Sequence, residues 1–375
     1  MLHTGLDRID EHLDLLRGRR LGLLAHPASL NQRGQHAVQV LARHAQLDLR
    51  ILFGPEHGFF GQANAGEKVS DARHPLFDLP IVSLYGEHRK PSTEMLADVD
   101  TIVVDLQDLA VRCYTFCTSL RYVLEAAAEQ GKSVVVLDRP VPLADTIDGP
   151  VTKPGFESFV SGIDAPLVYG MTPGETAGWL KHSLHLDVEL NIIQMRHYTR
   201  APAHLQAGPP WVPPSPGIRS WQSAYVYPVT VFTEALPRLH CDRAGTLPFQ
   251  LLLIPGIQGR ALAEQVTIPG IECYPDWRYL NDELVEGVRI VPSDFTHYRP
   301  VATAVHLLHA IQQLVGVDTW WQQDGVREDF FDQLMGTDTV RESLKANESP
   351  EKIVESWECS IQSFRETRIH HLLYG

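Results

Sequence analysis

Short apolar runs alternate with helical stretches along the first 150 residues of the chain. The runs that predict strands lie at 19–26, 47–54, 79–84, 100–108 and 132–140. Amphipathic stretches at 34–45 and 114–131, and a shorter piece near 93–97, predict the helices between them. Strands that are apolar along their whole length are typical of a parallel sheet covered on both faces. We therefore predict an α/β fold with a Rossmann-like, doubly wound parallel sheet.

The pattern changes after Pro150. Residues 201–217 are dense in Pro and Gly and predict a long loop. Short strands are expected between 246 and 306, and helices at 303–316 and from 353 to the end. Because 375 residues exceed what one core usually organises, we expect two domains. These are a Rossmann-like catalytic domain over 1–150, with an extension to about 230 also open, and an auxiliary α+β domain over 151–375.

Composition and charge narrow the classes of partner. The formal net charge of −14 gives the chain no general attraction for nucleic acid. No apolar run reaches the roughly 18 residues of a membrane span, so we expect no membrane segment. The start, MLHTGLDRIDEHLDLL, lacks the pattern of a signal peptide. We expect a cytoplasmic protein as given, and a periplasmic or secreted one if a leader has been trimmed.

Metal and cofactor motifs are missing from the sequence. The five cysteines form no C-x-x-C pair, and the 18 histidines include no H-E-x-x-H. No G-x-G-x-x-G, P-loop or G-x-S-x-G motif is present. We therefore expect no metal, no cofactor and no serine nucleophile of the usual α/β type.

Polar residues follow the predicted strands, at the edge of the sheet where α/β proteins bind ligands. They are Glu56 and His57 after the second strand, Tyr85 after the third, Asp105, Gln107, Asp108 and Arg112 around the end of the fourth, and Asp138 and Arg139 at the end of the fifth. Because these ends meet at one edge, we expect a site there. Several ends carry carboxylates or their partners, which favours a catalytic site over isolated structural roles.

Glu56 is the central candidate. It lies in GPEHG, where Gly54, Pro55 and Gly58 predict a tight, rigid turn. Apolar neighbours such as Phe59 would raise the pKa of a carboxyl there, as a general acid requires. The structural alternatives are that Glu56 caps the next element or pairs with an Arg.

The other charged candidates also have structural alternatives. Asp105 suits a cation, sugar hydroxyls or a helix cap. Arg112 suits a bidentate grip on a carboxylate or an ion pair with Asp105 or Asp138. The Asp-Arg pair at 138–139 most often fixes loop geometry. Glu175 fits the third position of a capping box that begins at Thr172, and this explains it without any ligand.

Together these residues resemble the NamZ-type exo-β-N-acetylmuramidases, glycoside hydrolase family 171, formerly the domain of unknown function DUF1343. The resemblance covers nearly the whole chain. The stretches that carry it are LFGPEHGFFG (52–61), SLYG (83–86), DTIVVDLQDLAVRCYTF (100–116), VVVLDRP (134–140), GMTPGE (170–175), WVPPSPG (211–217), YP (227–228) and W357…F364…R368…LLY (372–374).

The resemblance implies a Rossmann-like domain with an auxiliary domain, and an enzyme that removes terminal N-acetylmuramic acid from peptidoglycan fragments. The family's proposed catalytic glutamate falls on Glu56. We expect Glu56 to protonate the leaving oxygen and Asp105 to activate water or stabilise positive charge, with a substrate-assisted route also open. Arg112 or Arg139 would pair with the lactyl carboxylate. The remaining predicted substrate-binding residues are His57, Tyr85, Gln107, Tyr114, Glu175 and Ser215.

The sequence departs from the family pattern in segments expected to line the substrate cleft. Val141 replaces an Asn, Tyr169 replaces a His, PSPNMP becomes PSPGIR, and EGTNLSEGRGTT becomes EALPRLHCDRAGTL, which keeps Glu234, Arg243, Gly245 and Thr246. These departures motivate a second hypothesis, a non-catalytic or diverged protein that binds sugar or peptidoglycan fragments. A phosphosugar enzyme ranks last because no phosphate motif is present. The partner expected is a small sugar, and the oligomeric state is open.

Overall fold

A computed structural model describes residues 1–64, 66–202 and 208–375, without the side chains of residues 318 and 319. Its largest sheet has seven strands in the order β3-β4-β2-β1-β5-β6-β9. All neighbouring strands run parallel except β3 and β4. The strands are β1 (Arg20–Ala25), β2 (Asp48–Gly54), β3 (Ala72–Arg73), β4 (Pro80–Ser83), β5 (Thr101–Asp105), β6 (Ser133–Leu137) and β9 (Glu189–Ile193).

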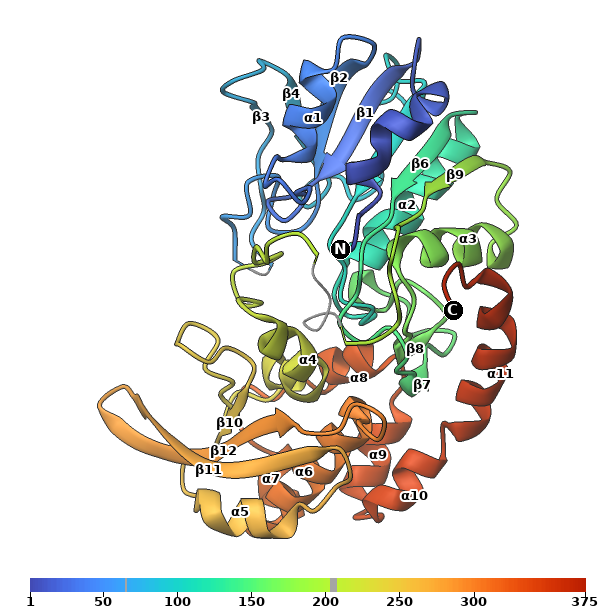
Figure 1. The fold of residues 1–375 in the computed structure, drawn as a ribbon. Coiled ribbons are helices and arrows are strands. Elements are labelled where there is room, and N and C mark those ends of the chain that lie inside the picture. Colours follow the sequence, from blue (N-terminus) through green and yellow to red (C-terminus); the bar gives the residue numbers. More distant parts are fainter. Residues whose placement is uncertain (65, 203–207) are drawn as a thin grey trace.

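Alternate residues of the central strands belong to two different cores, which explains their continuous apolar sequences. In β5, Ile102 and Val104 pack with α2 (Phe116–Glu129) and α3 (Pro173–Ser183). Val103 faces the opposite core, with α1 (Ala37–Arg43) and the 3₁₀ helix η1 (Leu6–Leu15). The predicted doubly wound parallel sheet is therefore confirmed (Figure 1).

The structure sharpens several predicted elements. The sheet runs past residue 150, because β9 pairs with β6. The helical piece predicted near 93–97 is wrong, since these residues form turns. Within 246–306, where short strands are expected, residues Gly259–Gln265 instead form the helix α5, and the strand β11 (Ile271–Leu280) begins only after it. Of the predicted loop at 201–217, residues 203–207 lie outside the described residues.

The second half of the chain builds a smaller antiparallel sheet with many helices. That sheet has the order β10-β12-β11, and a separate pair joins β7 to β8. The strands are β7 (Asp148–Val151), β8 (Pro166–Val168), β10 (Leu251–Leu253), β11 (Ile271–Leu280) and β12 (Glu283–Pro292). The helices are η2 (Phe159–Ser161), α4 (Trp221–Thr230), η4 (Val231–Glu234), α5 (Gly259–Gln265), α6 (Pro300–Val315), α7 (Val317–Trp321), α8 (Glu328–Met335), α9 (Thr339–Lys345), α10 (Pro350–Glu355), α11 (Glu358–Arg368) and η5 (Ile369–His371).

The C-terminal segment returns to the large sheet (Figure 1). The Tyr374 hydroxyl donates a 2.6 Å hydrogen bond to Oδ2 of Asp138, just beyond β6. The Leu373 amide donates to Oε1 of Glu175 at 2.9 Å. Burial raises the pKa of Asp138 to about 6, while the donors around it oppose that rise. These contacts fix the last residues of the chain onto the Rossmann-like half.

Candidate active site

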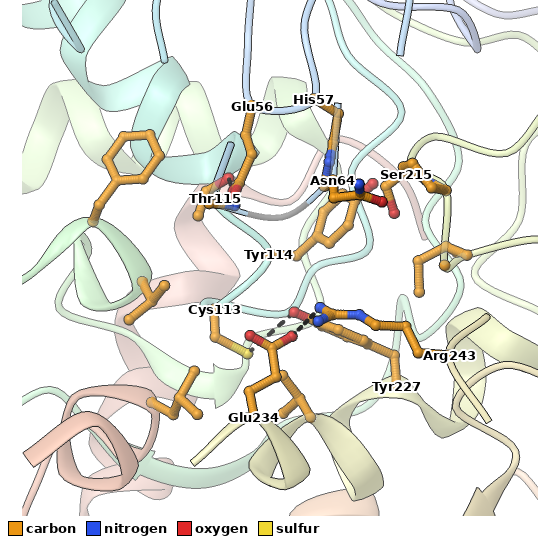
Figure 2. Close-up of a pocket in the computed structure, with 18 of the residues that line it drawn as sticks. Glu56, His57, Asn64, Cys113, Tyr114, Thr115, Ser215, Tyr227, Glu234 and Arg243 are labelled. Carbon is orange, nitrogen blue, oxygen red and sulfur yellow. Dashed lines mark hydrogen bonds and ion pairs between the residues drawn. The ribbon is translucent and has the colours of Figure 1, made fainter. Parts of the chain in front are cut away.

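The main cavity lies where the strand ends of the large sheet meet the second half of the chain, and its volume is about 680 Å³. The turn after β2 and the loop after β4 form one side. Residues 113–116 and 215–219 form further parts of the wall. The other side comes from η4, the segment around Arg243 and α8 (Figure 2). Residues from both halves of the chain therefore line the cavity.

The turn that carries Glu56 is as rigid as its sequence predicts. The Gly58 amide donates to the Pro55 carbonyl at 2.9 Å, which closes the turn after β2. His57 and Gly58 both have positive φ, at 70° and 80°. A side chain on Gly54 would lie 2.6 Å from the backbone nitrogen of Phe59, so only glycine fits there. The backbone strain at His57 is of the kind that often marks a functional site.

The Glu56 carboxylate is 8% exposed and lines the cavity. The Thr115 hydroxyl donates to its Oε2 at 2.6 Å, and the Gly66 amide donates to its Oε1 at 3.2 Å. Donors on both oxygens hold the carboxylate in one orientation. Thr115 immediately precedes α2, so the helix that covers one face of the sheet also positions the carboxylate.

A second carboxyl, that of Glu234, lines the same cavity from η4. Figure 2 shows Glu56 and Glu234 on opposite walls, with Arg243 paired to Glu234. Burial raises the pKa of Glu234, and the charge of Glu56 adds to this rise, while Arg243 opposes it. Two carboxyls that face one cavity are the usual arrangement of a glycosidase site.

Four predicted substrate-binding residues also line the cavity: His57, Tyr85, Tyr114 and Ser215. The Nδ1 atom of His57 lies 2.9 Å from the Ala63 carbonyl, and burial lowers the pKa of the imidazole. Burial, with the nearby charge of Glu56, raises the pKa of Tyr85 to about 12. Burial also raises the pKa of Tyr114 well above its usual value. Both phenols are therefore neutral hydrogen-bonding groups at physiological pH.

Asp105 does not line this cavity. Its carboxylate is fully buried and paired with Arg139, whose Nη2 atom lies 3.0 Å from Oδ2. Gln107 and Arg139 border a separate cavity of about 130 Å³ with Pro140 and Trp221. The expectation that Asp105 is the second catalytic carboxylate is corrected here, because an ion pair already occupies its oxygens. Arg139 lies beside Asp105 because β5 and β6 are parallel neighbours that end at the same edge of the sheet.

Arg112 is fully buried and holds the two halves of the chain together. Its guanidinium donates to the carbonyls of Pro150 and Ala165 at 2.9 and 2.6 Å, and to those of Leu334 and Met335 at 3.2 and 2.5 Å. Burial lowers the pKa of Arg112 to about 10. The expectation that Arg112 grips a substrate carboxylate is therefore corrected, because backbone carbonyls already use its Nη1 and Nη2 donors and the residue does not line the cavity.

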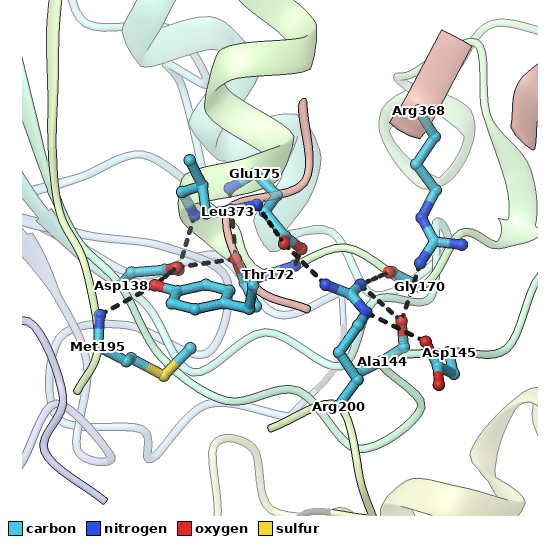
Figure 3. Close-up of polar contacts among 12 residues, drawn as sticks. Asp138, Ala144, Asp145, Gly170, Thr172, Glu175, Met195, Arg200, Arg368 and Leu373 are labelled. Carbon is cyan, nitrogen blue, oxygen red and sulfur yellow. Dashed lines mark hydrogen bonds and ion pairs between the residues drawn. The ribbon is translucent and has the colours of Figure 1, made fainter. Parts of the chain in front are cut away.

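Glu175 has the structural role that its sequence context favours. It completes a capping box with Thr172 at the start of α3. Its Oε1 atom accepts from Arg200 at 2.7 Å as well as from the Leu373 amide (Figure 3). The carboxylate is fully buried and outside the cavity. The expectation that Glu175 contacts the substrate is therefore corrected.

The departures from the family pattern divide between core and cavity. Val141 is fully buried, and Tyr169 donates to Asp108 at 3.2 Å, so neither lines the main cavity. Arg219, at the end of PSPGIR, does line it, as do Glu234 and Arg243. In the sequence, only the partial match of residues 234–247 to a family segment expected to line the cleft points to Glu234 and Arg243.

Over residues 1–64, 66–202 and 208–375, no group of three or more His, Cys, Asp or Glu side chains is arranged to hold a metal ion. No helix in those ranges is long and apolar enough to cross a membrane.

The large sheet is doubly wound, and two carboxyls line a sugar-sized cavity at its strand ends. This arrangement is that of an α/β protein with a glycosidase-like site. Within this class, the chain belongs to the NamZ exo-β-N-acetylmuramidase family. The N-terminal family model matches residues 21–222 and the C-terminal model matches residues 225–374. The resemblance inferred from the sequence is therefore confirmed.

Relatives of known name and structure agree with this membership. The peptidoglycan β-N-acetylmuramidase NamZ of Bacillus subtilis (strain 168) is 33% identical over 383 residues, covering 100% of this chain and 91% of that protein. A DUF1343 family protein of Bacteroides fragilis has a crystal structure with a TM-score of 0.93 and 29% identity, covering 100% of this chain and 99% of that one. A second B. fragilis DUF1343 protein, at 24% identity and a TM-score of 0.77, shares the fold with the same coverage.

Proposed function

We propose that this protein is a glycosidase that releases terminal N-acetylmuramic acid from peptidoglycan fragments. Its family and its B. subtilis relative support this activity. The observation that carries the proposal is that Glu56 and Glu234 line one cavity of about 680 Å³, large enough for a sugar. Thr115 and Gly66 donate to the Glu56 carboxylate, whereas Arg243 pairs with Glu234, so the two carboxyls have different surroundings.

In the proposed reaction, the bond between the anomeric carbon and the leaving oxygen breaks, and water supplies the new hydroxyl. Glu234 gives its proton to the leaving oxygen, because its surroundings raise its pKa. Arg243 then stabilises the carboxylate that remains. Thr115 and Gly66 donate to the carboxylate of Glu56 and hold it in position. Its carboxylate stabilises positive charge at the anomeric carbon and takes the proton of the attacking water.

This assignment moves the role of proton donor from Glu56, where the sequence placed it, to Glu234. Glu56 keeps its place at the centre of the site. The N-acetyl carbonyl of the substrate offers the alternative nucleophile, with Glu56 orienting that group. The anomer first formed, read by NMR during turnover, distinguishes the routes: direct attack of water inverts the configuration and the substrate-assisted route retains it.

The test of the proposed function is product analysis with saccharides that differ only in their non-reducing sugar. We expect free N-acetylmuramic acid, identified by mass spectrometry, from a disaccharide that ends in this sugar. We expect no product from the matching disaccharide that ends in N-acetylglucosamine. Binding by calorimetry without any turnover would instead support the non-catalytic sugar-binding protein.

A further inference from the structure

The main cavity is locally cationic although the chain is strongly acidic. Among the described residues that line it, the charged side chains are four arginines and two glutamates: Arg89, Arg219, Arg243, Arg327, Glu56 and Glu234. The chain as a whole has a formal net charge of −14. A cavity that gathers positive charge against this background favours an anionic ligand.

Three of these arginines already have acceptors. Arg243 pairs with the carboxylate of Glu234. Arg327 donates to the Glu234 carbonyl, and its guanidinium carbon lies 4.5 Å from the Phe330 ring centre. Arg219 donates to the carbonyls of Pro216 and Gly245 at 3.0 and 2.8 Å. Their donors are therefore at least partly used within the protein.

Arg89 differs from them. Among the residues that the structure describes, its guanidinium has neither a carboxylate partner nor a hydrogen-bond acceptor. Its guanidinium carbon lies 4.5 Å from the ring centre of Phe159 and 5.7 Å from that of Tyr85. The two rings lie 5.5 Å apart. Stacking uses the face of a guanidinium and leaves its N–H donors in the plane for a ligand.

The aromatic contacts hold Arg89, an exposed residue, in the wall of the cavity. Phe159, from η2, is 6% exposed and also packs against Tyr122 of α2, with ring centres 6.1 Å apart. The charges of both Glu56 and Arg89 act on the Tyr85 phenol. The guanidinium therefore lies against a largely buried ring, in the wall of the cavity that Glu56 also lines.

We propose that Arg89 recognises the carboxylate of the substrate sugar and so determines specificity. This inference rests on the proposed function. N-acetylmuramic acid differs from N-acetylglucosamine by a lactyl ether that ends in a carboxylate. The planar fork of an arginine matches that group with two parallel hydrogen bonds. Arg112 and Arg139, which the sequence favoured for this contact, are both buried with partners of their own.

The test compares an aryl N-acetylmuramide with its methyl ester, the same sugar without the negative charge. For Arg89→Gln we expect the KM of the acid to rise about tenfold or more, with kcat changed by no more than about threefold. The KM of the ester should stay the same. Arg89→Lys should recover part of the loss. Arg260→Gln, on an exposed arginine of α5, is the matched control and should change neither substrate.

Calorimetry with N-acetylmuramic acid and its methyl ester separates this proposal from the proposed function. If the wild type binds the acid more tightly than the ester and Arg89→Gln removes that preference, the Arg89 assignment stands even where no substrate is turned over. If Arg89→Gln changes acid and ester equally, or changes neither, the assignment is overturned even where hydrolysis is normal. Failure of the wild type to bind either sugar also overturns it.

Discussion

The guanidinium of Arg139 pairs with the carboxylate of Asp105 at the ends of two neighbouring strands, and both side chains are almost completely buried. Removing one partner of such a pair leaves an uncompensated charge in the interior. We predict that Asp105→Asn lowers the free energy of unfolding by about 3–5 kcal/mol in urea titrations. The folded fraction should keep a kcat within about threefold of the wild type, because Asp105 does not line the active cavity.

The control is an ion pair at the surface. Asp48 and Arg50 pair at 2.6 Å with about half of each side chain exposed, so Asp48→Asn should cost less than about 1 kcal/mol. An Asp105→Asn variant as stable as the wild type but with a kcat reduced more than about a hundredfold would return Asp105 to the chemistry.

A second prediction concerns which glutamate donates the proton. Glu234→Gln should lose about 10²–10⁴-fold in kcat with a sugar leaving group, which needs protonation. It should lose far less with a dinitrophenyl leaving group, which departs without a proton. Glu56→Gln should lose activity with both. Steady-state rates on the two substrate types measure this, and the opposite pattern, with leaving-group dependence in Glu56→Gln, would reverse the roles.

A third prediction follows from the pair of Glu234 and Arg243. The proposed acid must be protonated, so activity falls as pH rises through the pKa of Glu234. Arg243 lowers this pKa, against the larger effect of burial. Arg243→Gln should therefore move the alkaline limb of the kcat–pH profile to higher pH. Arg278→Gln, at a neighbouring ion pair outside the cavity, should leave that limb unchanged. A shift of the limb to lower pH in Arg243→Gln would contradict the assignment.

The sheet and half of the site follow from local patterns. Continuous apolar runs such as those of β5 and β6 predict a covered parallel sheet, and the Gly and Pro residues around Glu56 predict its turn. Because parallel strands end at one edge of the sheet, where α/β proteins bind ligands, the residues Glu56, His57 and Tyr85 that follow them are predicted to line a site there. These predictions succeed because the period of the pattern and the turn residues act over short stretches of chain.

The other half of the site depends on how the two halves of the chain meet. Glu234 lies on a single 3₁₀ turn, and no periodic pattern marks it as a partner of Glu56. Arg89 is marked only by its contacts with Tyr85 and Phe159, two rings that are far apart in the sequence and meet in the folded chain. The same position at a strand end wrongly predicted a catalytic role for Asp105. Position alone does not tell which side chains at neighbouring strand ends form an ion pair with each other.

The most direct test of the central claim is the release of N-acetylmuramic acid by the wild type, Glu56→Gln and Glu264→Gln. Glu264 lies on α5 with most of its side chain exposed, so its variant is the matched control. We predict that Glu56→Gln, folded as the wild type by circular dichroism, loses at least about 10³-fold in rate while Glu264→Gln keeps full activity. A Glu56→Gln variant that releases the sugar at the wild-type rate would contradict the account.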